Sequence, residues 1–305
     1  MVFSEKYLRD TIYACWLGKN IGGTMGTPFE GQKTLNDISG FNSKPGEPLP
    51  NDDLDLQLVW LRAVNDYGIK AINSKLLGEY WVSFINPCWN EYGIGKLNMA
   101  RGMYPPLSGD YDNSWRDSNG AWIRTEIWAC LCPGLPDLAA HYAIEDAMVD
   151  HGVGEGTIAA AFVAAMEAAA FPLPDLRSCI ELGLSRIPAA SRTAISVRLA
   201  MECYDKELTP KKARETIRLS NTDIGDGWRP RHGQTDVYGN LIEDRIYTNS
   251  DYDYNIIIED RINQVAKEIT DYLKSTDRMQ KTIVFCAMEE HAERMRIALN
   301  NLNAD

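Results

Sequence analysis

Acidic side chains gather at two places near the start of the chain. Asp52 and Asp53 stand side by side after Asn51, and Glu30 ends a glycine-rich stretch, residues 18–30. Clustered carboxylate oxygens are the ligands that Mg²⁺ and Ca²⁺ prefer in proteins. Adjacent acids also suit the positive end of a helix and cap its free N–H groups. Spacing alone leaves both explanations of the Asp52 and Asp53 pair open. For residues 18–30, a helix end followed by a tight turn is the alternative to a functional site.

A polar loop around residues 117–124 could bind an anion. It contains Gly120 and leads toward an apolar run. A loop of this kind at the start of a helix points backbone N–H groups at a ligand. A simple helix cap at Ser118 or Asn119 is the alternative, because both side chains are good caps.

A histidine lies in a second polar stretch, residues 150–156. His151 stands between Asp150 and three glycines, directly before an alanine-rich run. Glycines leave room for a ligand close to the backbone. A turn between two helices, with an incidental histidine, remains possible.

The composition excludes several other kinds of function. The 305 residues include 31 Lys and Arg and 43 Asp and Glu, a net charge of −12. This balance argues against a nucleic acid or an anionic membrane surface as a partner, and not against divalent metals. Neither a dinucleotide-binding glycine fingerprint nor a P-loop is present.

The remaining compositional features predict a cytoplasmic protein. Seven cysteines are scattered, and Cys130 and Cys132 have no second pair at zinc spacing, which predicts free thiols. The first residues do not resemble a signal peptide. The longest apolar stretch, residues 158–171, is shorter than the roughly 20 residues that cross a bilayer.

Helices should position these residues over the first 220 positions. Ser4 can cap a first helix, and proline at the first turn indicates helices that start at Pro136 and Pro210. Between residues 67 and 115 we expect a loop-rich wall with one helix near 73–85. Eight alanines between 159 and 170 predict a central, buried helix. Further helices are expected at 54–64, 175–186 and 189–204.

The last third of the chain has a different character. Residues 221–258 are rich in Gly, Asp and Tyr. An amphipathic helix follows, with Ile262, Ala266 and Ile269 on one face. Residues 281–287 are typical of a buried parallel strand, and a second amphipathic helix follows from 289. Helix, strand and helix together predict a small α/β fragment.

Four motifs in order resemble the ADP-ribosylglycohydrolase family, also called the dinitrogenase-reductase-activating glycohydrolase family. They are GGTMGTPFE, NDDLDLQ, SNGAWIR and DHGVGEGTIAAA, and the resemblance covers about residues 5–228. It implies a mainly all-α fold, an orthogonal helix bundle, over a domain at 1–226. This domain would be truncated at its C-terminal end.

The resemblance also implies the catalytic and metal-binding residues. Asp52 and Asp53 would bind metal, together with Asn51, which stands where the family usually has threonine. Glu30 would approach the metals and the reacting ribose carbon. Glu30 or Asp53 would act as the general base.

The same resemblance places the substrate. Asn119 and Gly120 would cradle a diphosphate, and Asp150, His151 and Gly152 would contact ADP-ribose. The partner is then an ADP-ribosylated protein or small molecule. The cofactor is Mg²⁺, two ions in the family and one or none here.

These implications describe a Mg²⁺-dependent hydrolase of the glycosidic bond to ADP-ribose. A later Asp-Thr-Asp motif of the family is missing, and residues 221–223 replace it poorly. We therefore expect impaired activity. A module that binds ADP-ribose without turnover is the alternative.

Residues from 227 onward resemble the motor subunit of type I restriction enzymes. In that setting KTIVFC is a core strand of a helicase-like domain, which we place at 227–305. Because the piece carries no P-loop, we expect no ATPase activity, although a fragment of such a motor is a third interpretation of the chain. The change of character near residue 227 leads to the hypothesis of a chimeric C-terminus.

Overall fold

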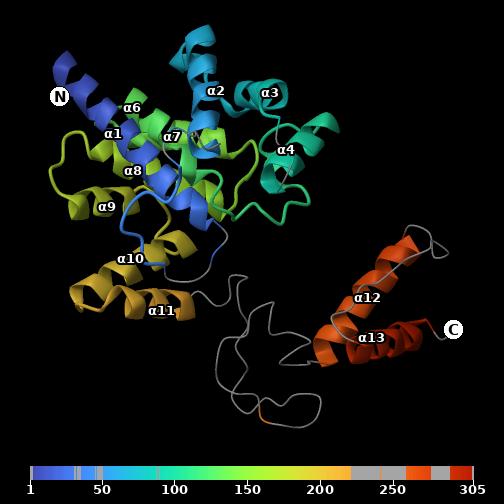
Figure 1. The fold of residues 1–305 in the computed structure, drawn as a ribbon. Helices are drawn as coiled ribbons and strands as arrows, with labels where there is room; N and C mark the ends of the chain where they lie inside the picture. The colour runs from blue at the N-terminus through green and yellow to red at the C-terminus, as the bar shows by residue number, and fades with distance from the viewer. Residues whose placement is uncertain are drawn as a thin grey trace. The chain divides into compact units, whose positions relative to one another are not determined.

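The structure is a computed structural model that describes residues 3–30, 32, 36–44, 46, 51–86, 88, 90–220, 241, 259–275 and 289–303. All regular elements among these residues are helices (Figure 1), which confirms the mainly all-α fold. The chain divides into two compact units, Met1–Met201 and Glu202–Asp305.

The first unit contains most of the helices. Its α-helices are α1 (Glu5–Gly26), α2 (Asp52–Tyr67), α3 (Ser74–Phe84), α4 (Asn90–Ala100), α5 (Leu107–Asp110), α6 (Glu126–Leu131), α7 (Pro136–Ala147), α8 (Glu155–Ala169) and α9 (Leu176–Leu184). Short 3-10 helices lie at η1 (Thr27–Phe29), η2 (Ile69–Ala71) and η3 (Trp122–Arg124). α10 (Arg192–Asp205) crosses the boundary between the units.

The glycine-rich stretch is more helical than a tight turn would be. Ser4 caps α1 as expected, since its Oγ accepts a hydrogen bond from the N–H of Tyr7 at 3.2 Å. α1 then continues through Gly18, Gly22 and Gly23 to Gly26 before η1 leads to Glu30. The turn is therefore confined to the last few residues of the stretch.

The predicted loop-rich wall between residues 67 and 115 is wrong in part. The expected helix is present as α3, but α4 and the short α5 follow it. α4 contains Gly93 and Gly95, which the sequence analysis took as loop residues. Close packing explains them, because a Cβ on Gly95 would lie 3.2 Å from the carbonyl oxygen of Val149.

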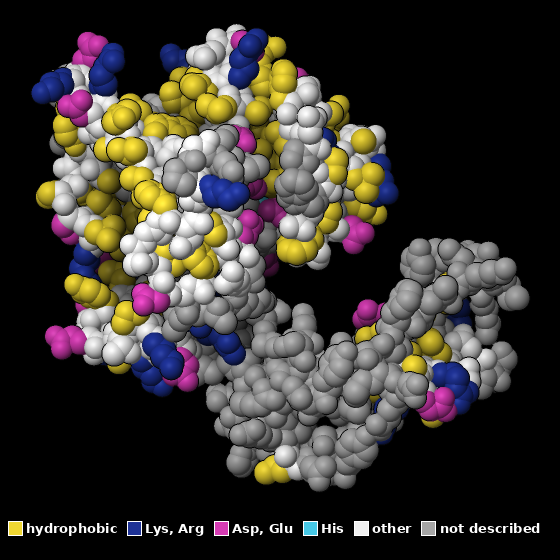
Figure 2. Space-filling view, in the orientation of Figure 1, with side chains coloured by type: hydrophobic (Ala, Val, Ile, Leu, Met, Phe, Trp, Pro, Cys, Tyr) yellow, Lys and Arg dark blue, Asp and Glu magenta, His cyan; other side chains and the backbone are white. Residues whose placement is uncertain are grey.

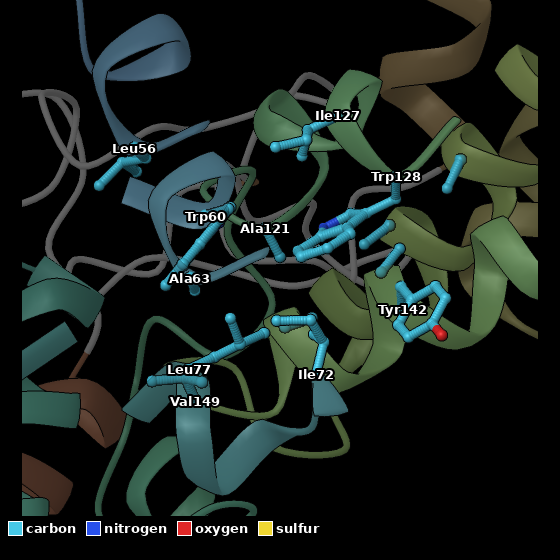
Figure 3. Close-up of a cluster of buried hydrophobic side chains, with 14 of the residues drawn as sticks. Leu56, Trp60, Ala63, Ile72, Leu77, Ala121, Ile127, Trp128, Tyr142 and Val149 are labelled. Carbon is cyan, nitrogen blue, oxygen red and sulfur yellow. The ribbon is translucent and has the colours of Figure 1, made fainter. Parts of the chain in front are cut away.

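A core of large side chains supports the site. Side chains from α2, α3, α6 and α7 turn toward one another in Figure 3, and Trp60, Leu77 and Trp128 are fully buried. The alanine-rich helix is buried as predicted, with Ala160, Ala164 and five further alanine or glycine positions of α8 facing neighbours. Small side chains allow α7 and α8 to pack closely.

The second unit contains α11 (Pro210–Ser220), α12 (Glu259–Ser275) and α13 (Glu289–Leu302). Ile262 and Ala266 of α12 pack against Met295 and Ala298 of α13, as their periodicity predicts. The expected strand at 281–287 and the expected boundary at 226/227 lie outside the described residues.

Some apolar surface remains exposed on the first unit. Hydrophobic side chains gather over the part of the molecule that holds α1 and α2 (Figure 2), where Tyr13, Leu17 and Leu58 are exposed. No described helix has the length and apolar character needed to cross a membrane.

Candidate functional site

The acidic pair opens α2, where the two carboxylates have different surroundings. Asp52 is exposed, and its Oδ2 accepts a hydrogen bond from the hydroxyl of Tyr92 at 2.8 Å. Asp53 is half-buried, and burial raises the pKa of its carboxyl group. Lys19 opposes this rise, while the carboxylates of Asp52, Glu126 and Glu30 add to it. The structure therefore brings Glu30 into the electrostatic environment of Asp53.

Asn51 serves the fold as a helix cap. Its Oδ1 accepts a hydrogen bond from the N–H of Asp53 at 3.1 Å. Its amide also lies against α1, because a Cβ on Gly23 would lie 2.1 Å from Asn51 Nδ2. Gly23 thus permits the close approach of α1 to the start of α2.

A set of polar residues that we call the lysine cluster (Lys19, Asp53, Gln57, Glu126 and Glu167) lies beside the acidic pair. Lys19 Nζ contacts Glu126 Oε1 at 2.7 Å and donates to the carbonyl oxygen of Ile123. Gln57 donates to Glu126 Oε2 at 2.8 Å and to the backbone oxygen of Asp53 at 2.7 Å. Burial and the Glu126 carboxylate raise the pKa of Glu167. One lysine thus faces several carboxylates.

A second set, the arginine cluster (Arg124, Trp128, Asp146 and Asp150), is completely buried. Arg124 donates to Asp146 Oδ1 at 3.0 Å and to the two oxygens of Asp150 at 2.7 and 3.2 Å. Trp128 Nε1 donates to Asp146 Oδ2 at 2.9 Å. Burial alone would raise the pKa of Asp150, but Arg124 and His151 lower it to about 2. Burial raises the pKa of Asp146 to about 6 against the opposing effect of Arg124.

His151 connects the arginine cluster to the polar loop. Its Nδ1 lies 2.9 Å from Asp150 Oδ1, although the contact is bent away from hydrogen-bond geometry. Its Nε2 lies 3.0 Å from the hydroxyl oxygen of Ser118. Ser118 therefore contacts a histidine and does not cap a helix.

Glycines around His151 permit close backbone contacts. Gly152 has a φ of +56°, a conformation that favours glycine. A Cβ on Gly109 would lie 2.1 Å from the backbone nitrogen of Gly152. A Cβ on Gly156 would lie 2.4 Å from the ring of His151. Part of the glycine-rich stretch 150–156 therefore serves packing.

Asp150 and His151 differ from Asn119 in their access to solvent. Both side chains have an exposed fraction of 0%, whereas Asn119 is exposed and Gly120 is buried beside it. The Arg124 Nη1 donates to the carbonyl oxygen of Gly120 at 2.5 Å. The arginine cluster thus holds the turn at Asn119 and Gly120 from inside.

Two residues at the start of α4, which the sequence analysis missed, lie between these groups. Tyr92 contacts Asp52 through its hydroxyl, and both Asp52 and Asp150 contribute to its raised pKa after burial. Glu91 is 6% exposed, and a Cβ on Gly120 would lie 2.1 Å from its Oε1. The only sequence signal for them is the Asn90-Glu-Tyr-Gly stretch, a polar helix start within an aromatic region.

The donor set at the acidic pair fits a hard divalent cation by type, because it consists of carboxylates with surplus negative charge. Asn51 is a weaker candidate, since its oxygen already caps α2. Among the described residues no group of three His, Cys, Asp or Glu side chains is placed to hold one metal ion.

Comparisons with known proteins agree with the order of motifs. A family model described as ADP-ribosylglycohydrolase matches residues 4–241, most of the chain. No solved structure matches the chain significantly.

A second similarity covers a shorter part of the chain. A type I restriction enzyme EcoAI endonuclease subunit from Escherichia coli is 57% identical over 79 residues, which is 26% of this chain. The chain spans only 10% of that curated relative.

Proposed function

Because the chain belongs to the ADP-ribosylglycohydrolase family, we propose that it hydrolyses the glycosidic bond between ADP-ribose and a protein side chain or a small molecule. The family supports a glycosidase that acts on ADP-ribosylated substrates.

The convergence of four separate motifs carries the proposal. Glu30 and the acidic pair share one electrostatic environment, and Tyr92 links Asp52 to the surroundings of Asp150. His151 and the turn at Gly120 lie against each other, since a Cβ on Gly120 would be 3.2 Å from the histidine ring. These interactions support the proposal that residues far apart in the chain line one region.

The proposed reaction needs a base and a stabilised transition state. Water adds to the anomeric carbon of the terminal ribose as the bond to nitrogen or oxygen breaks. Glu30 or Asp53 accepts the proton of that water, the leaving group takes a proton from solvent, and the carboxylic acid later returns its proton to solvent. Burial raises the pKa of Asp53, which is the direction that favours proton uptake by its carboxylate. Nearby carboxylates stabilise the positive charge that develops on the sugar.

We further propose that Asp52 and Asp53, with Asn51, hold Mg²⁺. When bound, the ion supplies orientation of the ribose hydroxyls and of the attacking water. The described residues present no group of three His, Cys, Asp or Glu side chains that converge on one point.

Calorimetric titration of ADP-ribose, with and without Mg²⁺, tests both proposals. We expect heat that depends on Mg²⁺, and the double variant Asp52→Asn, Asp53→Asn should abolish it because both anionic ligands are lost. Asp55→Asn is the matched control, since Asp55 is an exposed acid in the same first turn of α2. Release of free ADP-ribose from an ADP-ribosylated side chain then measures turnover.

Two results would contradict these proposals. An unchanged affinity in the double variant would show that the metal assignment is wrong. A folded protein that neither binds ADP-ribose nor releases it would show that the proposed function is wrong.

Binding without turnover is the second candidate function. The family's later Asp-Thr-Asp motif is missing from the sequence, which favours this candidate because the family's chemistry uses metal ions. Mg²⁺-independent binding of ADP-ribose with no release from any ADP-ribosylated substrate would support this candidate over hydrolysis.

The similarity to a restriction enzyme subunit bears on the origin of the chain. We propose that the C-terminal part is a chimeric addition, because two unrelated families match one chain. Sequencing the gene across codons 215–240 tests this, and an independent relative with the same layout would contradict an assembly artefact. The match to one tenth of a motor subunit supports no proposal of DNA translocation.

A further inference from the structure

Two cysteines that are distant in the chain, Cys15 of α1 and Cys130 of α6, make a hydrogen bond between their thiol groups. The same two helices also meet where Lys19 Nζ lies 2.7 Å from Glu126 Oε1. Cys15 precedes Lys19 by four residues, and Cys130 follows Glu126 by four. Since residues four apart share one face of a helix, the thiol contact and the ion pair are neighbouring contacts between α1 and α6.

The two thiols differ in how readily they lose a proton. The hydrogen bond with Cys130 is the main cause that lowers the pKa of Cys15, and the charge of Lys19 acts in the same direction. Burial and the Glu126 carboxylate oppose this effect. The hydrogen bond, burial and the carboxylates of Glu167 and Glu126 raise the pKa of Cys130. Because the thiolate is the nucleophile, Cys15 is the thiol that attacks, and Cys130 is a protonated thiol beside it.

Access to solvent also distinguishes this pair. Cys15 and Cys130 are half-buried, so a small oxidant can reach them, whereas Cys132, Cys179 and Cys203 are buried. Burial raises the pKa of Cys132 to about 11, which makes that thiol less reactive. An accessible thiol with a lowered pKa, next to a second thiol, is typical of redox-sensitive cysteines.

We propose that Cys15 and Cys130 form an oxidation site, at which hydrogen peroxide converts the two thiols into a reversible disulfide between α1 and α6. The Cys15 thiolate attacks one peroxide oxygen, the O–O bond breaks, and a sulfenic acid and hydroxide form. The sulfur of Cys130 then attacks the Cys15 sulfur, an S–S bond forms, and the hydroxyl group leaves as water with the Cys130 proton. The hydroxide takes up the proton that Cys15 released.

The electrons balance in this sequence. The thiol pair loses two electrons, one molecule of peroxide gains them, and two molecules of water are produced. A dithiol reductant reverses the reaction by thiol–disulfide exchange.

The disulfide would act on the first unit, beside the lysine cluster. It lies one helical turn from the contact of Lys19 with Glu126, so oxidation fixes the two helices that carry this ion pair. It also closes the long loop of residues 15–130 within the first unit. Closing a long loop constrains the unfolded chain, so the oxidised protein should be more stable than the reduced protein.

The test exposes the fully reduced full-length chain to hydrogen peroxide. Thiol titration in denaturant should show the loss of two of the seven thiols, and dithiothreitol should restore both. Mass spectrometry of a proteolytic digest should identify one cross-link, between the peptides that contain Cys15 and Cys130. Urea denaturation should show a higher midpoint for the oxidised protein.

Variants separate the roles of the two thiols. Cys130→Ser removes the thiol that closes the bond, so a sulfenic acid should accumulate on Cys15, where dimedone traps it. Cys15→Ser should give neither a cross-link nor a sulfenic acid on Cys130 at the same peroxide concentration. Cys132→Ala and Cys88→Ser are matched controls, one buried and one exposed, and both should still form the disulfide.

Three results would overturn the proposal. A cross-link between any other two cysteines, or between two chains, would show that the pairing is wrong. Cys15 and Cys130 that stay reduced while the exposed Cys88 is oxidised would show that the pair is not an oxidation site. A sulfenic acid on Cys130 in Cys15→Ser, with none on Cys15 in Cys130→Ser, would contradict the assignment of the attacking thiol. Peptide mapping of the wild-type chain decides the pairing even where a variant fails to fold.

Discussion

The arginine cluster and the lysine cluster both hold carboxylates inside the protein. They differ in how completely a cation balances the negative charge. Arg124 is fully buried and satisfies both Asp146 and Asp150 with hydrogen bonds. Its effect lowers the pKa of Asp150 to about 2. In the lysine cluster the ion pair of Lys19 and Glu126 is 13% exposed on each side, and the pKa of Glu167 is raised.

The difference follows from the shapes of the two cations. A guanidinium presents five donors in a plane and can bind two carboxylates at once, whereas an ammonium is a point charge. The arginine cluster is thus closed and balanced, and we assign it the role of holding the turn at Gly120. The lysine cluster keeps surplus negative charge beside Asp53, which suits a cation or a developing positive charge on a substrate.

The largest expected effect comes from breaking the arginine cluster. Arg124→Met should lower the free energy of unfolding by about 4 kcal/mol, because two buried aspartates lose their cation. Lys19→Met should cost clearly less, since its partner keeps some access to water. Urea denaturation followed by circular dichroism measures both. Equal losses for the two variants would contradict the distinction between the clusters.

A smaller loss of stability is expected from a substitution at Gly109, where two backbone segments are in close contact near the arginine cluster. Gly109→Ala should destabilise by about 2 kcal/mol, because its Cβ would lie 2.1 Å from the nitrogen of Gly152 and 2.6 Å from that of His151. Gly22→Ala is the control in α1, where no atom lies within 4 Å of the added Cβ. Alanine should raise stability slightly there through its helix propensity. Thermal unfolding of both variants checks the contrast, and a neutral Gly109→Ala would refute the tight contact.

The smallest effect should appear as a pH dependence in the lysine cluster. The folded pKa of Glu167 lies above its unfolded value, so its stabilising contribution is present at low pH and lost as pH rises through the folded pKa. Glu167→Gln should therefore be more stable than wild type at pH 8 and not near pH 4. Denaturation at both pH values measures this.

Glu79→Gln, an exposed control on α3, should show no pH-dependent difference from wild type. A Glu167→Gln variant that loses stability at pH 8 would mean that Glu167 is charged and well compensated in the folded protein. The lysine cluster would then be as balanced as the arginine cluster.

Much of the fold could be predicted where the signal is local. Ser4, Pro136 and the alanine run of α8 marked their helices because capping and small-residue packing act over one or two turns. The sequence did not predict α4, because its glycines are typical of loops. The reason for a glycine at position 95 is a close contact with Val149, which is distant in the chain.

Some residues of the candidate site could likewise be predicted from the sequence, and others could not. Motif order alone indicates one family for Glu30, the acidic pair, the turn at Gly120 and His151. The sequence could not reveal Glu91 or the Ser118 contact, because both depend on which side chains meet across separate helices.

The sequence by itself determined the helical class, the family and the chemical types of the site residues, since these depend on local pattern and motif order. Only the tertiary structure decided that a cation balances the charge of Asp150 and that the charge around Asp53 is not balanced. That outcome depends on distance and burial: Asp150 meets Arg124 at 2.7 Å inside the protein, whereas Asp53 shares one lysine with several acids. Electrostatic energies vary steeply with both quantities, and neither can be deduced from residue order.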